Sequence, residues 1–328
     1  MAQTSLNRGL NRGQGDFPGL APALDSARRE ITGRAGRLSY YTAGPDRDRG
    51  EGAPADPVLL LHSINAAASA YEVRPIFQFL RGERPVYAPD LPGYGFSDRS
   101  DRYYDRDLFV AAVHDMLDLV RAEHPGRKVD VLALSLTAEF AARAIASRQD
   151  EVGRLVLVTP TGFDRRAAGR SGPPGGTLEM GPMARLLEGT GLGRALFRPL
   201  ASRASIAYFL RRTFGGPDVP PDLVDYAWRT AHQPGGHHAP LAFLSFRLFS
   251  TDIRQVYERL TLPVWVPHAT RGDFRDFSAT AWAEARPNWL FQPYATGALP
   301  QFQMPDAFLT DLRRFLDSGT PALARAGE

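Results

Sequence analysis

A serine between a predicted strand and a predicted helix is the residue of this 328-residue chain whose position best suits chemistry. The apolar run at residues 129–133 predicts a strand, residues 137–147 predict a helix, and Ser135 lies in the turn between them. A sharp turn of this kind lifts one side chain above the edge of the sheet. A serine hydroxyl in that position can act as a nucleophile, provided that a neighbouring base accepts its proton.

Glu139 is one candidate for this base, because it lies four residues after Ser135 and therefore on the same face of the helix. A partly buried carboxylate beside the serine would have a raised pKa and could accept the proton. The alternative, which we favour, is an ion pair between Glu139 and Arg143, another four residues along the helix.

Histidines offer two further candidates. His268 ends a predicted strand that leads to Asp273, so its ring could approach the same edge of the sheet. His237 lies in a glycine-rich turn that could fold over Ser135, although only one ring of the adjacent pair His237 and His238 could point there. An ordinary structural role is the favoured alternative for each ring. No further ligand stands at a recognisable spacing from the pair, so we predict no metal site.

The composition excludes several classes of function. The chain has no cysteine, which excludes disulfides, thiolate metal sites and cysteine nucleophiles. Its net charge of +3 comes from arginines spread along the chain, which favours a solvated surface over a nucleic-acid site. No apolar run approaches the ~20 residues that span a bilayer, and the N-terminal segment has no hydrophobic stretch typical of a signal peptide. We therefore expect a cytoplasmic protein with no membrane span that binds no nucleic acid.

Strands that alternate with helices would position these residues. Strands are predicted at residues 58–61, 86–88, 129–133, 155–158, 264–266 and 289–291, with helices at 71–80, 107–123, 137–147 and 305–316. This alternation implies a mostly parallel sheet flanked by helices.

Residues 163–259 interrupt the alternation with helical patterns alone, and we expect them to form a lid over the carboxyl edge of the sheet. Apolar lid residues, among them Leu186, Leu196 and Phe209, should cover that edge. The predicted division of the chain is a disordered tail at 1–28, a core at 29–162 and 260–318, the lid at 163–259 and a second tail at 319–328.

Three segments together resemble the α/β-hydrolase fold superfamily. Residues 90–97, DLPGYGFS, are close to the family's D-x-P-G-x-G-x-S turn. The turn around Ser135 resembles the family's nucleophile elbow, with Ala133 and Thr137 at the places of two glycines. His62 and Ser63 resemble the His-Gly turn of the oxyanion hole. The resemblance covers about residues 30–317 and implies an α/β-hydrolase fold, with a mostly parallel central sheet flanked by helices and a helical lid insertion.

The resemblance also assigns roles. Ser135 would be the nucleophile, and Asp273 would be the acid unless it simply pairs with Arg271 or Arg275. Ala298 occupies the position of the catalytic histidine, in the loop before the last helix. The backbone amides of Ile64 and Leu136 would form the oxyanion hole, because backbone donors need no particular side chain. Contacts with the substrate would come from Ser63, Tyr71, His237 and Phe243.

An enzyme with an altered triad is therefore the first hypothesis. It would act on an ester, a thioester or a carbon–carbon bond of a small to medium hydrophobic substrate around Ser135. The alternatives are a catalytically silent protein of the same fold that binds a hydrophobic small ligand, and a non-hydrolytic lyase-type member. Each reading requires a small-molecule substrate or ligand and no cofactor, and we expect a monomer or a dimer.

Overall fold

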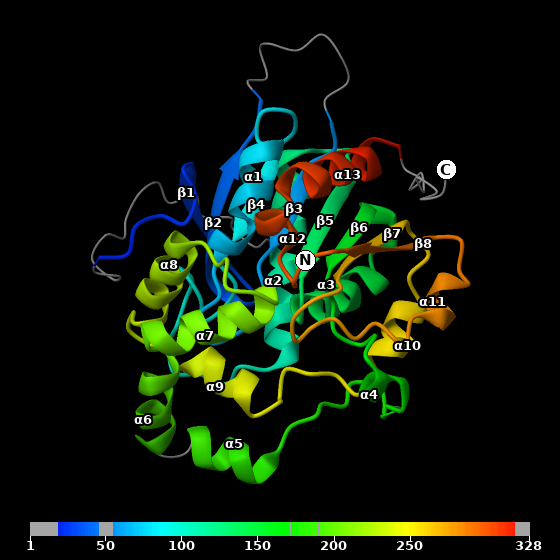
Figure 1. Ribbon diagram of the computed structural model, residues 1–328. Helices are drawn as coiled ribbons and strands as arrows, with labels where there is room; N and C mark the ends of the chain where they lie inside the picture. The colour runs from blue at the N-terminus through cyan, green and yellow to red at the C-terminus, as the bar shows by residue number, and fades with distance from the viewer. Residues whose placement is uncertain (1–18, 46–54, 171, 189–190, 319–328) are drawn as a thin grey trace, which may run out of the picture.

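An eight-stranded sheet forms the centre of the computed structural model, which describes residues 19–45, 55–170, 172–188 and 191–318 (Figure 1). The strands lie in the order β1-β2-β4-β3-β5-β6-β7-β8. Strand β2 pairs antiparallel with both β1 and β4, and every other neighbouring pair in the sheet is parallel. This confirms the mostly parallel sheet expected from the sequence. The strands are β1 (Ala27–Gly33), β2 (Gly36–Ala43), β3 (Val58–Leu61), β4 (Val86–Pro89), β5 (Val129–Leu134), β6 (Val152–Val158), β7 (Val264–Ala269) and β8 (Trp289–Tyr294).

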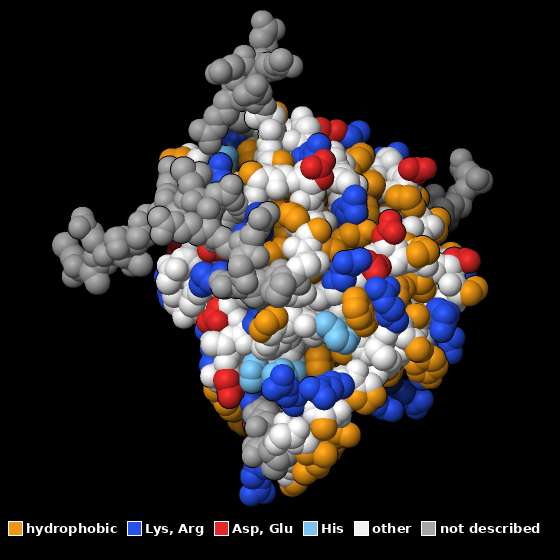
Figure 2. Space-filling model, turned by 90° about the vertical axis from the view of Figure 1, so that its left-hand side faces the viewer, with side chains coloured by type: hydrophobic (Ala, Val, Ile, Leu, Met, Phe, Trp, Pro, Cys, Tyr) orange, Lys and Arg blue, Asp and Glu red, His pale blue; other side chains and the backbone are white. Residues whose placement is uncertain are grey.

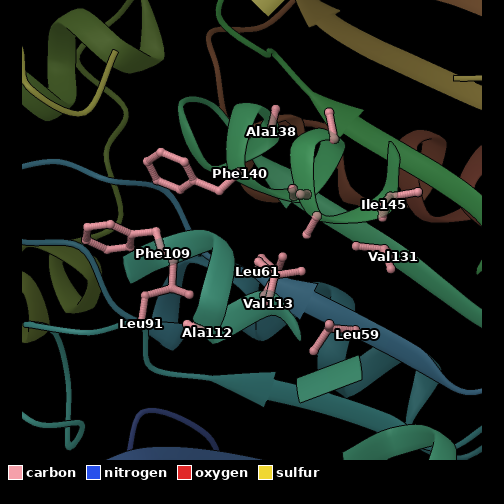
Figure 3. Packing of buried hydrophobic residues seen from close by; sticks show 14 of the residues in the cluster. Leu59, Leu61, Leu91, Phe109, Ala112, Val113, Val131, Ala138, Phe140 and Ile145 are labelled. Atoms are coloured by element: carbon pink, nitrogen blue, oxygen red, sulfur yellow. The ribbon is translucent and has the colours of Figure 1, made fainter. Parts of the chain in front are cut away.

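Helices cover both faces of the sheet, because the central strands are apolar on both sides. Leu59 and Val131 belong to a core cluster with Phe140 of α3, whereas Leu60 belongs to a cluster on the opposite face with Phe308 of α13. Figure 3 shows side chains of β3 and β5 packed with those of α2 and α3. The helices and 3-10 turns of this core are η2 (Ala70–Val73), α1 (Arg74–Leu80), α2 (Arg106–Glu123), α3 (Thr137–Ala146), η3 (Gln149–Glu151), α11 (Ala281–Glu284), α12 (Pro300–Gln303) and α13 (Pro305–Ser318).

Between β6 and β7 the chain leaves the sheet and forms a helical insertion. Its described residues contain no strand, only an isolated bridge between Thr177 and Ser250. Helices α5 to α9 gather beside one end of the sheet, in the lower left of Figure 1. The helices are α4 (Arg165–Ala168), α5 (Gly181–Glu188), α6 (Gly191–Leu200), α7 (Arg203–Phe214), α8 (Pro221–Ala231), α9 (His238–Leu244) and α10 (Ile253–Glu258).

The apolar residues of the insertion divide between two environments. Leu187 and Phe197 are buried, as expected for helices that cover a surface. Leu186, Leu196 and Phe209 remain 48%, 48% and 49% exposed, so the expectation that they cover the sheet edge is wrong. Each helix turns only a narrow stripe inward, and these three side chains lie outside that stripe.

The expected N-terminal tail also needs a correction. Residues 1–18 lie outside the described part of the chain, but residues 19–28 pack against the core. Leu20 and Leu24 are buried, and the backbone amide of Ala23 donates a hydrogen bond to the Tyr41 hydroxyl at 2.9 Å. The apolar residues of this short segment anchor it, although the polar sequence before them favours disorder. The second expected tail, at residues 319–328, lies outside the described residues.

Candidate active site

Ser135 follows β5 with a left-handed backbone conformation, φ 52°. Its amide donates to the carbonyl oxygen of Val158 at the end of the neighbouring strand β6, at 3.0 Å. Thr159, the next residue of that segment, is left-handed as well, with φ 44°. Non-glycine residues in this region cost about 1 kcal/mol or more each, and such strain is concentrated at functional sites. Two strained residues at adjacent strand ends therefore mark this edge of the sheet as the candidate site.

The backbone amides of Ile64, three residues after β3, and of Leu136, directly after Ser135, form no hydrogen bond with any described residue. The turn that carries Ile64 is tied to the elbow by Thr137, whose hydroxyl donates to the carbonyl oxygen of His62 at 2.7 Å. Thr137 is fully buried, so this bond satisfies a hydroxyl at a place where the sequence resemblance expects glycine. The arrangement leaves two donors that a developing oxyanion could use.

His62 holds this turn rather than serving as a base. Its Nε2 atom accepts a hydrogen bond from the amide of Leu91 at 2.9 Å, so the proton lies on Nδ1, which donates to the carbonyl oxygen of Ser63 at 2.7 Å. Burial lowers the pKa of His62, which keeps the ring neutral.

Glu72, which the sequence did not reveal, is a buried carboxylate beside the same turn. It accepts hydrogen bonds from the amide of Ser63 at 2.8 Å, from the Ser63 hydroxyl at 3.1 Å and from Asn65 Nδ2 at 2.9 Å. Ser63 therefore faces Glu72, which leaves its proposed contact with substrate unsupported. Glu72 stands between the apolar residues Tyr71 and Val73, and a carboxylate in such a run was the available signal. Tyr71 itself stacks on Tyr226 of α8, with ring centroids 4.8 Å apart.

Asp273 lies in the loop after β7, but its carboxylate is held by the helical insertion. Arg212 of α7 donates from Nε to Asp273 Oδ2 at 2.6 Å, and the amide of Asp273 donates to the carbonyl oxygen of Arg212 at 3.1 Å. The acid therefore pairs with Arg212 and not with Arg271 or Arg275. Both side chains are exposed, so the pair is accessible to water.

The C-terminal end of α7 also contacts the loop that carries Ala298. The amide of Ala298 donates to the carbonyl oxygen of Thr213 at 2.9 Å. A Cβ atom on Gly297 would collide with that same oxygen. Gln303 Nε2 donates to the carbonyl oxygen of Phe214 at 3.1 Å. The end of α7 thus binds both the loop of Asp273 and the loop of Ala298, the two places that a triad acid and base would occupy.

Glu139 is buried on α3 and bonds to the two ends of the insertion. Its carboxylate accepts from the hydroxyl of Thr161, just after β6, at 2.5 Å and from the amide of Ser250 at 2.9 Å. Arg143 pairs instead with Asp252, Nη2 to Oδ1 at 2.6 Å, so the favoured Glu139–Arg143 ion pair is wrong. Burial raises the pKa of Glu139. Its two oxygens are occupied by these donors and form no hydrogen bond with Ser135.

The structure brings no histidine to Ser135 within the described part of the chain, where the serine hydroxyl makes no hydrogen bond. His268 stacks on Phe277, with ring centroids 4.2 Å apart, and burial lowers its pKa. Phe243 packs against Phe249, 5.5 Å between centroids, at the margin of the core. Neither His268 nor Phe243 contacts the elbow.

His237 lies against its neighbour His238, with ring centroids 4.0 Å apart. Both rings line a surface pocket of about 560 Å³ whose wall includes Arg102, Arg194 and Arg247 and does not include Ser135. Figure 2 shows histidine and basic side chains side by side on one face of the molecule. Burial lowers the pKa of His237 to about 4, with the neighbouring His238 as the next cause, so the ring is neutral at pH 7. The flexible turn expected to fold over the serine is therefore part of a separate pocket wall.

Comparison with known proteins places the whole arrangement in a family. A sequence profile described as the alpha/beta hydrolase family matches residues 58–312. A 2-hydroxymuconate semialdehyde hydrolase from Pseudomonas sp. strain CF600 is 29% identical over 108 residues, which cover 32% of this chain and 37% of that protein. A haloalkane dehalogenase from Psychrobacter cryohalolentis is 41% identical over 88 residues, covering 25% and 26%. The alignments thus span about a third or less of these relatives.

Solved structures resemble the fold over almost its full length. A serine hydrolase involved in carbazole degradation superimposes with a TM-score of 0.67 and 16% identity, covering 89% of this chain and 99% of that one. Cfl2 from Burkholderia cenocepacia superimposes with a TM-score of 0.65 and 24% identity, covering 88% and 95%. At these identities the likeness confirms the fold that the sequence predicted and carries no further conclusion.

Proposed function

Because this chain belongs to the alpha/beta hydrolase family, we propose that it is an enzyme that acts at Ser135 without a triad histidine. Its substrate would be a small to medium hydrophobic molecule with an ester, a thioester or a carbon–carbon bond next to a carbonyl. The observation that carries the proposal is the left-handed conformation of Ser135, together with the amides of Ile64 and Leu136, which have no acceptor among the described residues. A protein with no use for this turn could relieve the strain with an ordinary loop.

The chemistry would rest on stabilising charge rather than on a strong base. The carbonyl oxygen of the substrate would accept hydrogen bonds from the amides of Ile64 and Leu136, and each such donor contributes about 10²–10³ to the rate. The Ser135 hydroxyl, or water bound by it, would form the new bond to the carbonyl carbon and pass its proton to solvent. The bond to the leaving group would then break, and where Ser135 itself had attacked, water would hydrolyse the acyl-serine ester and restore the free hydroxyl. Without an imidazole to protonate the leaving group, the best substrates are those whose leaving group is stable as an anion.

A lid over this site is part of the same proposal. Ala66 and Ala67, just after the turn of Ile64, pack with Leu187, Phe197 and Leu241 of the insertion. The Tyr71–Tyr226 stack joins the same region to α8. These contacts support an insertion that covers the carboxyl edge and keeps water from the carbonyl.

The relatives support a hydrolytic reaction on a small organic molecule, since they include a 2-hydroxymuconate semialdehyde hydrolase and a haloalkane dehalogenase. One observation favours the silent binder as a second candidate. Asp273 is bound to Arg212, and no described base reaches Ser135. A lyase-type reaction would fit the same site, because it needs the oxyanion donors and one polar group.

The test is turnover of three substrates that differ in the bond to be broken: p-nitrophenyl butyrate, butyrylthiocholine and 1-phenylbutane-1,3-dione. We expect the protein to convert at least one of them faster than buffer alone does. In Ser135→Ala the rate should fall to that of buffer alone. Ser147→Ala, at the other end of α3, is the matched control and should keep the wild-type rate. No conversion of any substrate, together with saturable binding of a hydrophobic fluorescent probe, would establish the silent binder instead.

A further inference from the structure

The outer surface of α5 and α6 combines exposed apolar side chains with arginines. In α6, Gly193 and Phe197 form the buried stripe, and the residues between them face outward. Leu192 and Leu196 are one helical turn apart and are 45% and 48% exposed. We call the following set the tip surface: Met180, Leu186, Leu192 and Leu196, with Arg185, Arg194 and Arg198.

The arginines of the tip surface have no acidic partner in the described part of the chain. Arg185, Arg194 and Arg198 form no ion pair with any residue that the structure describes, whereas Arg203 and Arg212 of the next helix pair with Asp225 and Asp273. Arg194 and Arg198 are one turn apart, so they form a stripe separate from the leucine stripe of the same helix. α5 and α6 lie at the lower end of the molecule, where Figure 2 shows hydrophobic and basic side chains next to one another.

We propose that the tip surface docks on an anionic lipid surface, with the leucines among the acyl chains and the arginines at the headgroups. An amphipathic helix with leucine on one stripe and arginine on another is typical of such binding. No described helix is long and apolar enough to cross a bilayer, so the contact would be peripheral. Charge argues against a second copy as the occupant, because a two-fold interface would place these unpaired arginines opposite one another.

The proposal does not depend on the reaction at Ser135, and its test needs no substrate. Purified full-length protein is sedimented with vesicles of phosphatidylcholine alone or of phosphatidylcholine and phosphatidylglycerol at 7:3. We expect binding to the anionic vesicles only, with an affinity that falls as salt is raised. Leu192→Glu/Leu196→Glu should abolish binding, and because both side chains are exposed, the variant should unfold at the wild-type urea concentration.

A charge variant separates specific docking from attraction of any basic protein. Arg194→Ala/Arg198→Ala should weaken binding about 30-fold, since each arginine at the surface of an anionic bilayer contributes about fivefold. Arg313→Ala/Arg314→Ala removes two charges from α13, at the opposite end of the molecule in Figure 1, and should leave binding unchanged. Absence of binding to anionic vesicles, or equal loss in both double variants, would overturn the proposal. So would a dimer in solution that Leu192→Glu/Leu196→Glu dissociates without any vesicle binding.

Discussion

At the scale of single residues, both candidate carboxylates are already bound: Asp273 by Arg212, and Glu139 by Thr161 and Ser250. The sequence predicted the turn at Ser135, because a turn between a buried strand and a helix is visible in the local apolar pattern. The partner of Asp273 could not be predicted, because Arg212 lies 61 residues away and reaches it only through the packing of the insertion. Glu139 was assigned the wrong partner for the same reason. Helical spacing brings Arg143 near, but the folded chain offers Thr161 and Ser250 as donors.

Restoring an imidazole should not by itself restore ordinary esterase activity. We predict that Ala298→His changes kcat/KM for p-nitrophenyl butyrate by less than about twofold, because Asp273 is held by Arg212 and cannot orient the ring. Arg212→Ala with Ala298→His frees the carboxylate and should raise kcat/KM at least about tenfold.

The matched control for this pair uses the neighbouring arginine of α7. Arg211→Ala with Ala298→His removes the same charge without touching Asp273, and should behave like Ala298→His alone. A large gain from Ala298→His alone would mean that the end of α7 leaves room for a working triad.

At the scale of elements, a buried carboxylate joins the elbow helix to the insertion. Glu139 connects α3 to Thr161, where the insertion begins, and to Ser250, near its end. The sequence predicted the strands and helices closely, since their apolar periodicities are local. It did not predict how the insertion attaches, because that depends on hydrogen bonds between segments about 90 residues apart in the chain (Thr161 to Ser250). It also did not predict the outward faces of α5 and α6.

Glu139 should make stability depend on pH. Burial raises its pKa above the usual 4.5, so above pH 4.5 the folded protein binds more protons than the unfolded chain. The stabilisation from this group is therefore complete below pH 4.5 and is lost as the pH rises through the folded-state pKa. We predict that the free energy of unfolding of Glu139→Gln, measured in urea from pH 5 to pH 8, falls less with pH than that of the wild type.

Glu258→Gln is the control for this experiment, because the Glu258 side chain is 40% exposed and pairs with Arg254 one turn away. Its pH dependence should match the wild type. If Glu139→Gln followed the wild-type slope, Glu139 would not be the group that links protonation to folding. Glu139→Ala should cost about 2 kcal/mol at pH 5, since it leaves the buried amide of Ser250 without an acceptor, and its difference from the wild type should shrink as the pH rises.

At the scale of the whole molecule, the sheet order and the covering of both faces follow from the sequence pattern. Alternating strands and helices with right-handed crossovers leave few arrangements, and the structure adopts one of them. The final strands and the start of the insertion meet in an aromatic cluster that periodicity does not reveal. Phe163 is fully buried and stacks on Tyr257 and Trp282, with ring centroids 5.1 and 5.8 Å apart.

Loss of this cluster should destabilise the whole domain. We predict that Phe163→Ala lowers the free energy of unfolding by about 3–5 kcal/mol, because a large buried ring is replaced by a cavity. Phe274→Ala, at a side chain 46% exposed, should change it by less than about 0.5 kcal/mol. Similar losses in urea denaturation for the two variants would show that Phe163 does not join these elements.

If Ser135 is a reaction centre without a histidine base, the pH dependence of turnover should differ from that of a serine hydrolase with a complete triad. We would measure kcat/KM for p-nitrophenyl butyrate from pH 5 to pH 9 for the wild type and Ser135→Ala. We predict that the wild-type rate exceeds that of Ser135→Ala at every pH and shows no midpoint near the ordinary histidine pKa of about 6.5. Equal rates for the two proteins would contradict Ser135 as the centre, and a sigmoid with its midpoint near 6.5 to 7 would contradict the absence of an imidazole base.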